Sequence, residues 1–322
     1  MTHKCQRILV TGGAGFIGSH LVDRLLKEGF EVVVIDNLDT GRLENISRHQ
    51  GRAEFRFIKG DIRDFNLVKK VIRDIDIVFH EAALASVTLS VEHPILSHEV
   101  NVTGTLNLLK ASSDFHIKRF IYASSAAIYG GTSLPQKREN MTPNPTSPYG
   151  VSKLAAETYV NLFHKVYGLE TVSLRYFNVY GPRQRFDIQS AYGGAITIFL
   201  NRLIRNMPPI IYGDGEQTRD FVYVQDIVEA NILALKSKHA AGEVFNIGTG
   251  TKVSINQVSS ILKEIMKRKN LKSIHADARL TDIRNGYADI SKAKKILAFN
   301  PKFSLKEGLA KLVDWYGKFA DC

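Results

Sequence analysis

The stretch TGGAGFIG at residues 11–18 separates an apolar run at residues 8–10 from a segment at residues 19–29 whose apolar residues recur at helical spacing. This order predicts a strand, a glycine turn and a helix. Glycines keep such a turn tight, and they let backbone N–H groups at the positive end of the helix approach a diphosphate. The stretch therefore predicts the first strand of a parallel α/β sheet and a dinucleotide-binding turn.

Each glycine of this turn has its own expected role. Gly12 would permit the tight turn, Gly15 would admit the diphosphate, and Gly18 would let helix and strand pack closely. A buried strand at residues 31–35 follows and ends at Asp36, whose carboxylate can accept hydrogen bonds from an adenosine ribose. Because this acid would repel a 2′-phosphate, we expect NAD rather than NADP as the cofactor.

Strand-like runs alternate with helical patterns over the first half of the chain. The runs lie at residues 8–10, 32–35, 55–58, 75–80, 119–124 and 171–175, and the helical patterns at residues 65–74, 94–113 and 149–167. Such alternation predicts the α/β class, with a doubly wound Rossmann sheet of parallel strands and helices on both faces. The cofactor should then lie across the carboxyl ends of the strands.

The chain of 322 residues exceeds the usual size of a single core, and its alternation becomes irregular after Asn178. Residues 222–224, a helix at 228–237 and a strand at 244–247 are expected to return to the sheet. We therefore expect a NAD-binding Rossmann domain at residues 1–178 plus about 222–248. A smaller, discontinuous C-terminal lobe at about 179–221 plus 249–322 would bind the substrate.

Composition excludes several classes of function. The net charge is +11, but Lys and Arg are spread along the chain, and the densest stretch, residues 263–272, is expected to be a solvated helix face. We therefore expect no nucleic-acid partner. Only Cys5 and Cys322 are present, and we see no signal peptide, membrane span or metal-ligand pattern. A reducing cytoplasm is the expected compartment.

A tyrosine, a lysine and a serine pair form a candidate proton-transfer site. Tyr149 and Lys153 stand four positions apart at the head of a helical pattern, so both should project from one face. A nearby ammonium favours the phenolate and lowers the pKa of a phenol. Tyr149 could then take a proton from a substrate hydroxyl, with Ser124 and Ser125 nearby.

The motifs together resemble the extended short-chain dehydrogenase/reductase family, specifically its nucleotide-sugar epimerase/dehydratase branch. The resemblance covers essentially the whole chain. The matching segments are residues 11–18, 36–37, 60–62, 80–83, 101–105, 123–130, 149–153, 175–181 and 219–224.

The resemblance implies bound NAD, a UDP-sugar substrate and specific residues for each. It implies catalytic roles for Ser125, Tyr149 and Lys153. The implied cofactor-binding residues are Gly12, Gly15, Phe16, Ile17, Gly18, Asp36, Asn37, Asp61, Ile62, Ala82, Ala83, Leu84, Asn101, Ser124, Tyr149, Lys153 and Tyr176. The implied substrate-binding residues are Ser86, Val87, Ser125, Asn178, Tyr212, Arg219, Arg279, Asp282 and Gly286, with Arg183 as a further candidate.

The residues after Ser125 favour one reaction of the resembling family over another. Its 4,6-dehydratases place an Asp-Glu pair there and its decarboxylases a glutamate, whereas this chain has Ala126-Ala127, which cannot transfer protons. We expect epimerisation at C4, in which Tyr149 takes the C4 hydroxyl proton while hydride passes to NAD. The 4-keto sugar would then turn and receive hydride on its other face.

The resemblance also indicates which sugars fit. Glucose-restricted 4-epimerases of the family carry a bulky tyrosine near the sugar C2 substituent, at the position that Gly286 occupies here. Glycine leaves room for an acetamido group, so we expect interconversion of UDP-GlcNAc and UDP-GalNAc together with UDP-glucose and UDP-galactose. A glycine that serves only a turn remains the alternative.

The sequence leaves two other functions open, and the resemblance also implies an assembly. A UDP-glucuronate 4-epimerase or decarboxylase needs a cation for the sugar carboxylate, and Lys137, Arg138 or Arg185 could serve. A catalytically inactive NAD-binding protein would be marked by loss of the serine, tyrosine or lysine. In the resembling family, helices such as those at about residues 96–113 and 148–167 pair with their copies, which implies a homodimer with a four-helix contact.

Overall fold

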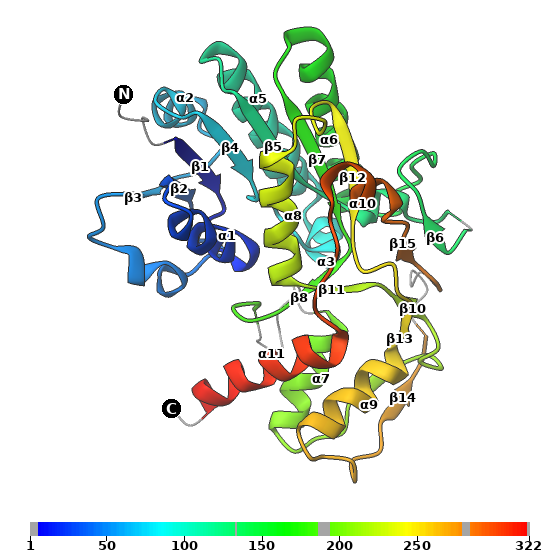
Figure 1. Cartoon of the computed structure of the whole chain (residues 1–322). Coiled ribbons are helices and arrows are strands. Elements are labelled where there is room, and N and C mark those ends of the chain that lie inside the picture. Colours follow the sequence, from blue (N-terminus) through cyan, green and yellow to red (C-terminus); the bar gives the residue numbers. More distant parts are fainter. Residues whose placement is uncertain (1–5, 133, 186–193, 279–283, 321–322) are drawn as a thin grey trace.

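A seven-stranded parallel sheet forms the centre of the protein (Figure 1). The computed structural model describes residues 6–132, 134–185, 194–278 and 284–320. The strand order is β3-β2-β1-β4-β5-β7-β12. The strands are β1 (Arg7–Thr11), β2 (Glu31–Asp36), β3 (Phe55–Lys59), β4 (Ile77–His80), β5 (Arg119–Ser125), β7 (Thr171–Tyr176) and β12 (Glu243–Ile247). The predicted doubly wound α/β fold is confirmed.

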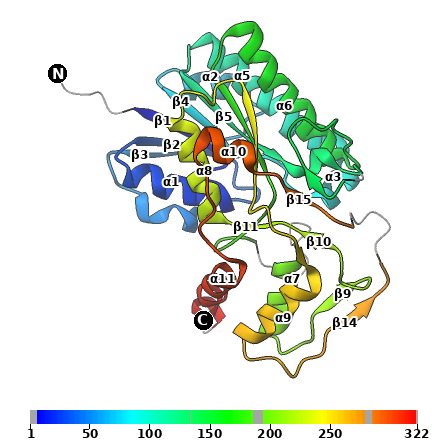
Figure 2. The same ribbon diagram turned by 45° about the vertical axis from the view of Figure 1, so that its right-hand side comes forward.

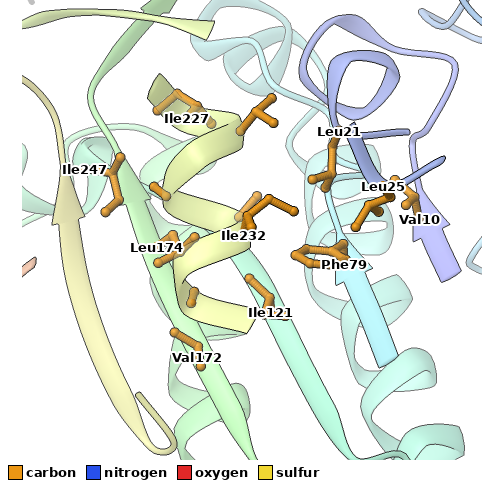
Figure 3. Packing of buried hydrophobic residues seen from close by; sticks show 14 of the residues in the cluster. Val10, Leu21, Leu25, Phe79, Ile121, Val172, Leu174, Ile227, Ile232 and Ile247 are labelled. Atoms are coloured by element: carbon orange, nitrogen blue, oxygen red, sulfur yellow. The ribbon is translucent and has the colours of Figure 1, made fainter. Parts of the chain in front are cut away.

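Helices cover both faces of this sheet (Figures 1 and 2). One face carries α2 (Phe65–Ile72), α5 (Gly104–Asp114) and α6 (Pro148–Tyr167), and the other carries α1 (Phe16–Lys27), α8 (Val224–Lys236) and α10 (Ser291–Leu297). Side chains of a strand point alternately to the two faces, so Ile8 and Val10 pack toward α1 and α8, whereas Leu9 packs toward α5 and α6. Figure 3 shows Ile227 and Ile232 of α8 among apolar side chains of the sheet.

The strand order reverses between β1 and β4. From β1 the chain proceeds outward to β2 and β3, and it then returns to lay β4, β5, β7 and β12 on the other side. The loops that leave the carboxyl ends of β1 and β4 therefore turn away from each other. A crevice for a ligand opens at such a switch point.

The second lobe packs three helices around a core of its own (Figure 2). These helices are α7 (Ala195–Ile204), α9 (Ile255–Ile265) and α11 (Leu305–Ala320). Short strand pairs lie beside them. β9 (Ile210–Tyr212) pairs with β14 (Ile274–Ala276), and β10 (Thr218–Arg219) pairs with β13 (Val253–Ser254). The chain enters this lobe more than once, since α7 and α9 are separated in sequence by α8.

Smaller elements complete the described chain. They are α3 (Val87–Glu92), α4 (Pro94–His98), β6 (Gln136–Lys137), which pairs with β15 (Tyr287–Ala288), and the 3₁₀ turns η1 (Leu43–Asn45), η2 (Ser47–His49) and η4 (Ala126–Tyr129). No helix within the described ranges has both the length and the apolarity needed to span a membrane.

The expected elements differ from the structure in three details. β11 (Phe221–Tyr223) does not join the central sheet, because it pairs with β8 (Asn178–Tyr180) in a separate two-stranded sheet. The helix expected at residues 94–113 is present without a break, but its middle, η3 (Glu99–Thr103), is π-helical and lies between α4 and α5. Of the basic residues at 263–272 only Lys263 lies on a helix, because α9 ends at Ile265 and the backbone turns there.

Gly18 is a sharp test of the packing between α1 and the glycine turn. A Cβ atom at this position would lie 2.3 Å from the backbone oxygen of Gly12. Since backbone must shift to relieve that contact, Gly18→Ala should lower the free energy of unfolding by about 1–3 kcal/mol. The measurement is urea denaturation followed by circular dichroism.

Gly317→Ala is the matched control. Gly317 lies in α11, and a Cβ atom there would meet no heavy atom within 4 Å. Alanine has the higher helix propensity, so this variant should raise the free energy of unfolding by up to about 1 kcal/mol. Equal stability of Gly18→Ala and the wild type would contradict the packing argument.

Candidate active site

A cavity of about 590 Å³ lies where the strand order reverses. It receives residues from the carboxyl ends of β1, β2, β4, β5 and β7 and from the first turns of α1 and α6. All but one of the expected cofactor-binding residues line it, namely Gly12, Gly15, Phe16, Ile17, Gly18, Asp36, Asn37, Asp61, Ile62, Ala82, Ala83, Leu84, Ser124, Tyr149, Lys153 and Tyr176. Ser125 lines it as well.

The glycine turn provides a floor of backbone for this cavity. Gly12 has a positive φ of 68°, and a Cβ atom there would lie 2.8 Å from the backbone nitrogen of Ala82. Gly15 is the N-cap of α1, where no side chain caps the helix. Because the first N–H groups of a helix have no partner within the helix, this turn fits a diphosphate.

Carboxylates stand at the end of the cavity that follows β2 and β3. Asp36 accepts hydrogen bonds from the backbone nitrogens of Ala14 at 3.0 Å and Leu38 at 2.8 Å, and burial raises its pKa. The Arg63 guanidinium lowers the pKa of Asp61 to about 2. A carboxylate next to the glycine turn is the feature expected for binding an adenosine ribose.

Asn101 is the expected cofactor residue that does not line the cavity. Its side chain is buried, its Oδ1 accepts a hydrogen bond from the Leu84 nitrogen at 2.8 Å, and its Nδ2 donates to the Leu84 oxygen at 3.2 Å. Asn101 therefore fixes the backbone of a lining residue. Ser86 caps α3 by accepting a hydrogen bond from the Leu89 nitrogen, and neither Ser86 nor the exposed Val87 lines this cavity.

The candidate catalytic side chains come from β5 and from the first two turns of α6. Ser147 caps α6 by accepting a hydrogen bond from the Gly150 nitrogen, which sets Tyr149 in the first helical turn. The Ser125 side chain lies close enough to the Tyr149 hydroxyl to lower the pKa of that phenol. Lys153 Nζ donates to the oxygen of Ala123 at 2.7 Å. The three expected catalytic residues therefore share one cavity wall.

The pKa of Tyr149 differs from the sequence-based expectation. Burial raises this pKa, and the Ser125 side chain opposes that shift only in part. Burial also lowers the pKa of Lys153 to about 8, against the attraction of Glu81 and Glu157. The expected lowering of the phenol pKa is therefore absent from this structure, because desolvation disfavours the phenolate more than its neighbours favour it.

A buried ion pair lies beneath the catalytic wall. Glu157, four residues after Lys153 on α6, pairs with Arg175 of β7, with Nη2 to Oε1 at 2.6 Å. Ser124 Oγ donates to Glu157 Oε2 at 2.6 Å. Arg175 also donates to the Tyr129 hydroxyl at 2.7 Å. The sequence analysis did not single out Glu157, although its spacing from Lys153 places both on one helix face.

Glu81 is a second residue that the sequence analysis did not assign. It lines the cavity directly after β4, and its Oε1 accepts a hydrogen bond from the Tyr176 hydroxyl at 2.8 Å. Asn231 of α8 in turn donates to the Tyr176 oxygen at 2.7 Å. Burial raises the pKa of Glu81 to about 7, opposed by Tyr176 and Lys153.

A second cavity of about 360 Å³ lies in the second lobe. Asn178, Tyr212 and Arg219, three of the expected substrate-binding residues, line it. Val179 and Gln184 line both this cavity and the larger one, so the two spaces adjoin. An aromatic ring and a guanidinium suit a nucleotide base and a phosphate, respectively.

Asp220 ties the strand of Arg219 to the segment of Gly286. This buried carboxylate accepts hydrogen bonds from the backbone nitrogens of Thr249 at 2.8 Å, Gly250 at 2.9 Å and Ala288 at 3.1 Å. The sequence analysis assigned Asp220 no role. Four accepted hydrogen bonds, including one from the Thr249 hydroxyl, offset the cost of burying it.

The remaining expected substrate residues have mixed positions. The Gly286 nitrogen donates to the Thr218 oxygen at 3.2 Å, and a Cβ atom at Gly286 would meet only Lys137 Cε, at 4.0 Å. Gly286 lines neither cavity. Arg183 lines the larger cavity, and its Nη2 pairs with Asp23 at 2.8 Å. Arg279 and Asp282 lie outside the described residues.

Comparison with known proteins identifies relatives along the whole chain. Residues 8–248 match the NAD dependent epimerase/dehydratase family. A UDP-glucuronate 4-epimerase of Thermodesulfobacterium geofontis is 38% identical over 315 residues, which are 95% of this chain and 95% of that protein.

Two solved structures share the fold over nearly their full length. A UDP-glucose 4-epimerase of Thermotoga maritima with UDP-glucose has a TM-score of 0.91 and 41% identity, and the match covers 98% of this chain and 99% of that chain. A UDP-N-acetylglucosamine 4-epimerase of Methanobrevibacter ruminantium in complex with UDP-N-acetylmuramic acid has a TM-score of 0.92 and 38% identity, with the same coverage of 98% and 99%.

Proposed function

Since the chain belongs to the NAD dependent epimerase/dehydratase family, we propose that it interconverts UDP-hexoses that differ in configuration at C4 and accepts 2-acetamido sugars. It is an NAD-dependent UDP-sugar 4-epimerase, as its relatives are. The finer proposal is that UDP-GlcNAc and UDP-GalNAc are substrates together with UDP-glucose and UDP-galactose.

One observation carries the proposal of a proton-transfer site. Ser125, Tyr149 and Lys153 line the same cavity as the glycine turn, and the Ser125 side chain lowers the pKa of the neighbouring Tyr149 phenol. A sugar hydroxyl that reaches the Tyr149 oxygen is therefore next to the space that fits the cofactor. The adjoining cavity, with Tyr212 and Arg219, suits the nucleotide end of the same substrate.

The chain's own residues have distinct roles in this reaction. NAD would be held by the glycine turn and Asp36, and when bound it would supply reversible hydride transfer. Tyr149 takes the proton of the C4 hydroxyl and gives it back, and Ser125 holds the Tyr149 oxygen in place. Because burial disfavours the phenolate, Tyr149 depends on the ammonium of Lys153, which lines the same cavity. In a 4-keto sugar C4 is planar, so rotation about the diphosphate linkage exposes its other face.

The two residues that follow Ser125 support epimerisation rather than dehydration. Ala126 and Ala127 begin the η4 turn directly after β5, and the Ala127 nitrogen donates to Ser125 Oγ at 3.1 Å. Elimination of water needs an acid and a base at neighbouring carbons, and methyl groups supply neither. Oxidation at C4 and its reversal need only the three residues already named.

The space at Gly286 supports the acceptance of acetamido sugars. A Cβ atom at this position would have only Lys137 Cε within 4 Å, at 4.0 Å, and the Gly286 nitrogen is hydrogen-bonded to the oxygen of Thr218, the residue before Arg219. Glycine leaves that space open. A bulkier residue would fill it and would compete with a C2 substituent larger than hydroxyl.

Reaction of UDP-glucuronate is the alternative, because one relative acts on that sugar. Of the three candidate cations, Lys137 and Arg138 do not line the larger cavity. Lys137 Nζ donates to Thr132 twice, at 2.9 and 2.6 Å, and to the Leu134 oxygen at 2.6 Å, while Arg138 pairs with Asp289 at 3.1 Å. Arg185 lines the larger cavity and is therefore the candidate placed to reach a sugar carboxylate there.

A homodimer forms part of the proposal. Apolar side chains lie exposed on α3, α4 and α6, which contact one another, and they include Val91, Ile95, Val151, Leu162 and Val166. Ile95 is 75% exposed and Val166 is 62% exposed. An apolar surface of this kind, on helices that flank the catalytic wall, fits a contact between two copies.

Tyr149→Phe tests the assignment of the proton-transfer residue. The variant lacks only the hydroxyl, so it should keep the wild-type melting temperature and lose about 10²–10⁴-fold in turnover. Products from UDP-galactose are resolved chromatographically without added cofactor. Tyr159→Phe, on the same helix but outside both cavities, should keep wild-type turnover. Wild-type turnover in Tyr149→Phe would disprove the assignment.

Gly286→Tyr tests the choice of sugar. The side chain should reduce turnover of UDP-GlcNAc at least about tenfold more than turnover of UDP-glucose, because only the acetamido group needs the open space. Both substrates are assayed on wild type and variant, with UDP-glucuronate as a third. Equal effects on the two hexoses would refute the gate, and preferred turnover of UDP-glucuronate by the wild type would establish the alternative.

Ile95→Glu tests the homodimer. A charge in the centre of a contact between copies is costly, so this variant should be monomeric when the wild type is dimeric at micromolar concentration. Light scattering measures the mass. Ile274→Glu places the same charge on another exposed apolar residue, on β14 of the second lobe, and should leave the dimer intact. A monomeric wild type would rule out the dimer.

A further inference from the structure

We propose that Glu81 makes the cavity favour the oxidised form of the nicotinamide cofactor, because its carboxylate lies beside the catalytic wall. The inference deepens the proposed function and rests on it for the identity of the cofactor. No role in the expected mechanism uses this residue, although it is a charged group that lines the cavity.

Backbone register places Glu81 near the reacting end of the cavity. It follows β4 directly, and β4 pairs with β5, which ends at Ser125. The partner of Glu81 is the Tyr176 hydroxyl, at 2.8 Å, and Tyr176 stands opposite Ser125 in the pairing of β5 with β7. The carboxylate is therefore held within the group of strands that carry the catalytic residues.

The other carboxylates of the cavity lie at its opposite end. Among the described lining residues, Asp36 and Asp39 follow β2, and Asp61 follows β3 at the edge of the sheet. Glu81 is thus the one carboxylate among those described that lines the cavity next to Lys153. Burial lowers the pKa of Lys153 and raises that of Glu81, and the attraction between the two groups opposes both shifts.

A fixed negative charge at this place distinguishes two oxidation states. Oxidation of the sugar moves a hydride from C4 to the nicotinamide ring and a proton to Tyr149, and the positive charge of the ring disappears. A carboxylate nearby stabilises the charged ring and leaves the neutral ring unaffected. An epimerase needs this bias, because each cycle starts from oxidised cofactor, and a reduced cofactor without a keto sugar is inactive.

The structure holds the side chain of Glu81 in a defined orientation. Asn231 donates to the Tyr176 oxygen at 2.7 Å, so the Tyr176 proton is directed to Glu81 Oε1. A glutamine at position 81 could still accept that hydrogen bond through its own Oε1. Glu81→Gln therefore removes the charge and keeps the shape.

The first experiment measures the dissociation constants of NAD⁺ and NADH for protein stripped of cofactor, without any sugar. In Glu81→Gln, binding of NAD⁺ should weaken about tenfold relative to NADH, as expected for loss of one nearby charge. That ratio corresponds to a rise of about 30 mV in the reduction potential of the bound cofactor. Glu81→Asp keeps the negative charge, so it should show most of the wild-type preference for NAD⁺ over NADH.

Asp61→Asn is the matched control. It removes a carboxylate from the far end of the same cavity, where the cofactor has the same structure in both oxidation states. Both dissociation constants should therefore change by the same factor. The proposal would be overturned if the ratio of the NAD⁺ and NADH dissociation constants were the same in Glu81→Gln as in the wild type. It would also be overturned if Asp61→Asn changed that ratio to a similar extent.

A second measurement needs no variant. The pKa of Glu81 is raised to about 7, so its charge is lost as pH falls below that value. Of the groups facing it, Lys153 has a pKa of about 8 and is already largely protonated at pH 7, and Tyr176, whose pKa lies well above its usual range, stays uncharged. The preference of the wild type for NAD⁺ over NADH should decline from pH 7 to pH 5.5, and a constant preference would contradict the proposal.

These measurements contain no sugar, so they are independent of which UDP-hexose reacts. A failed sugar assay with the expected NAD⁺ preference would leave the role of Glu81 standing. An unchanged preference with normal epimerase activity would remove the role of Glu81 alone.

Discussion

The buried pair of Glu157 and Arg175 is the interaction on which the catalytic wall depends. Burying two charges is costly unless each finds full hydrogen bonding, and here the carboxylate also accepts from Ser124 while the guanidinium also donates to Tyr129. The four residues come from β5, η4, α6 and β7. Only one relative placement of these elements satisfies all of them, and that placement brings Ser125, Tyr149 and Lys153 to one surface.

The second lobe uses a similar device with backbone donors. Asp220 lies between Arg219 and β11, and it accepts hydrogen bonds from residues 249, 250 and 288, which are distant in sequence. The segments that approach the substrate therefore share one buried anion. β11, which follows Asp220 directly, pairs with β8 rather than with the central sheet. The same anion therefore also stabilises the place where the chain passes from one lobe to the other.

The sequence alone predicted the parallel sheet and the cavity, because these depend on local signals. Apolar runs, glycines and one acid after β2 each stand in a short window. Glu157 and Glu81 escaped notice because their significance comes from partners on other strands, at Arg175 and Tyr176. The predicted lowering of the Tyr149 pKa was wrong for the same reason. Spacing reveals a neighbouring ammonium, but it does not reveal that burial removes solvent from both groups.

The pairing of β8 with β11 has a consequence for modular engineering. The chain enters and leaves the second lobe more than once, through strands that are hydrogen-bonded to each other. No single contiguous gene fragment therefore encodes that lobe. A chimera that grafts a new sugar pocket onto this scaffold has to transplant two stretches together and preserve the β8–β11 ladder, where the first stretch leaves and rejoins the Rossmann domain.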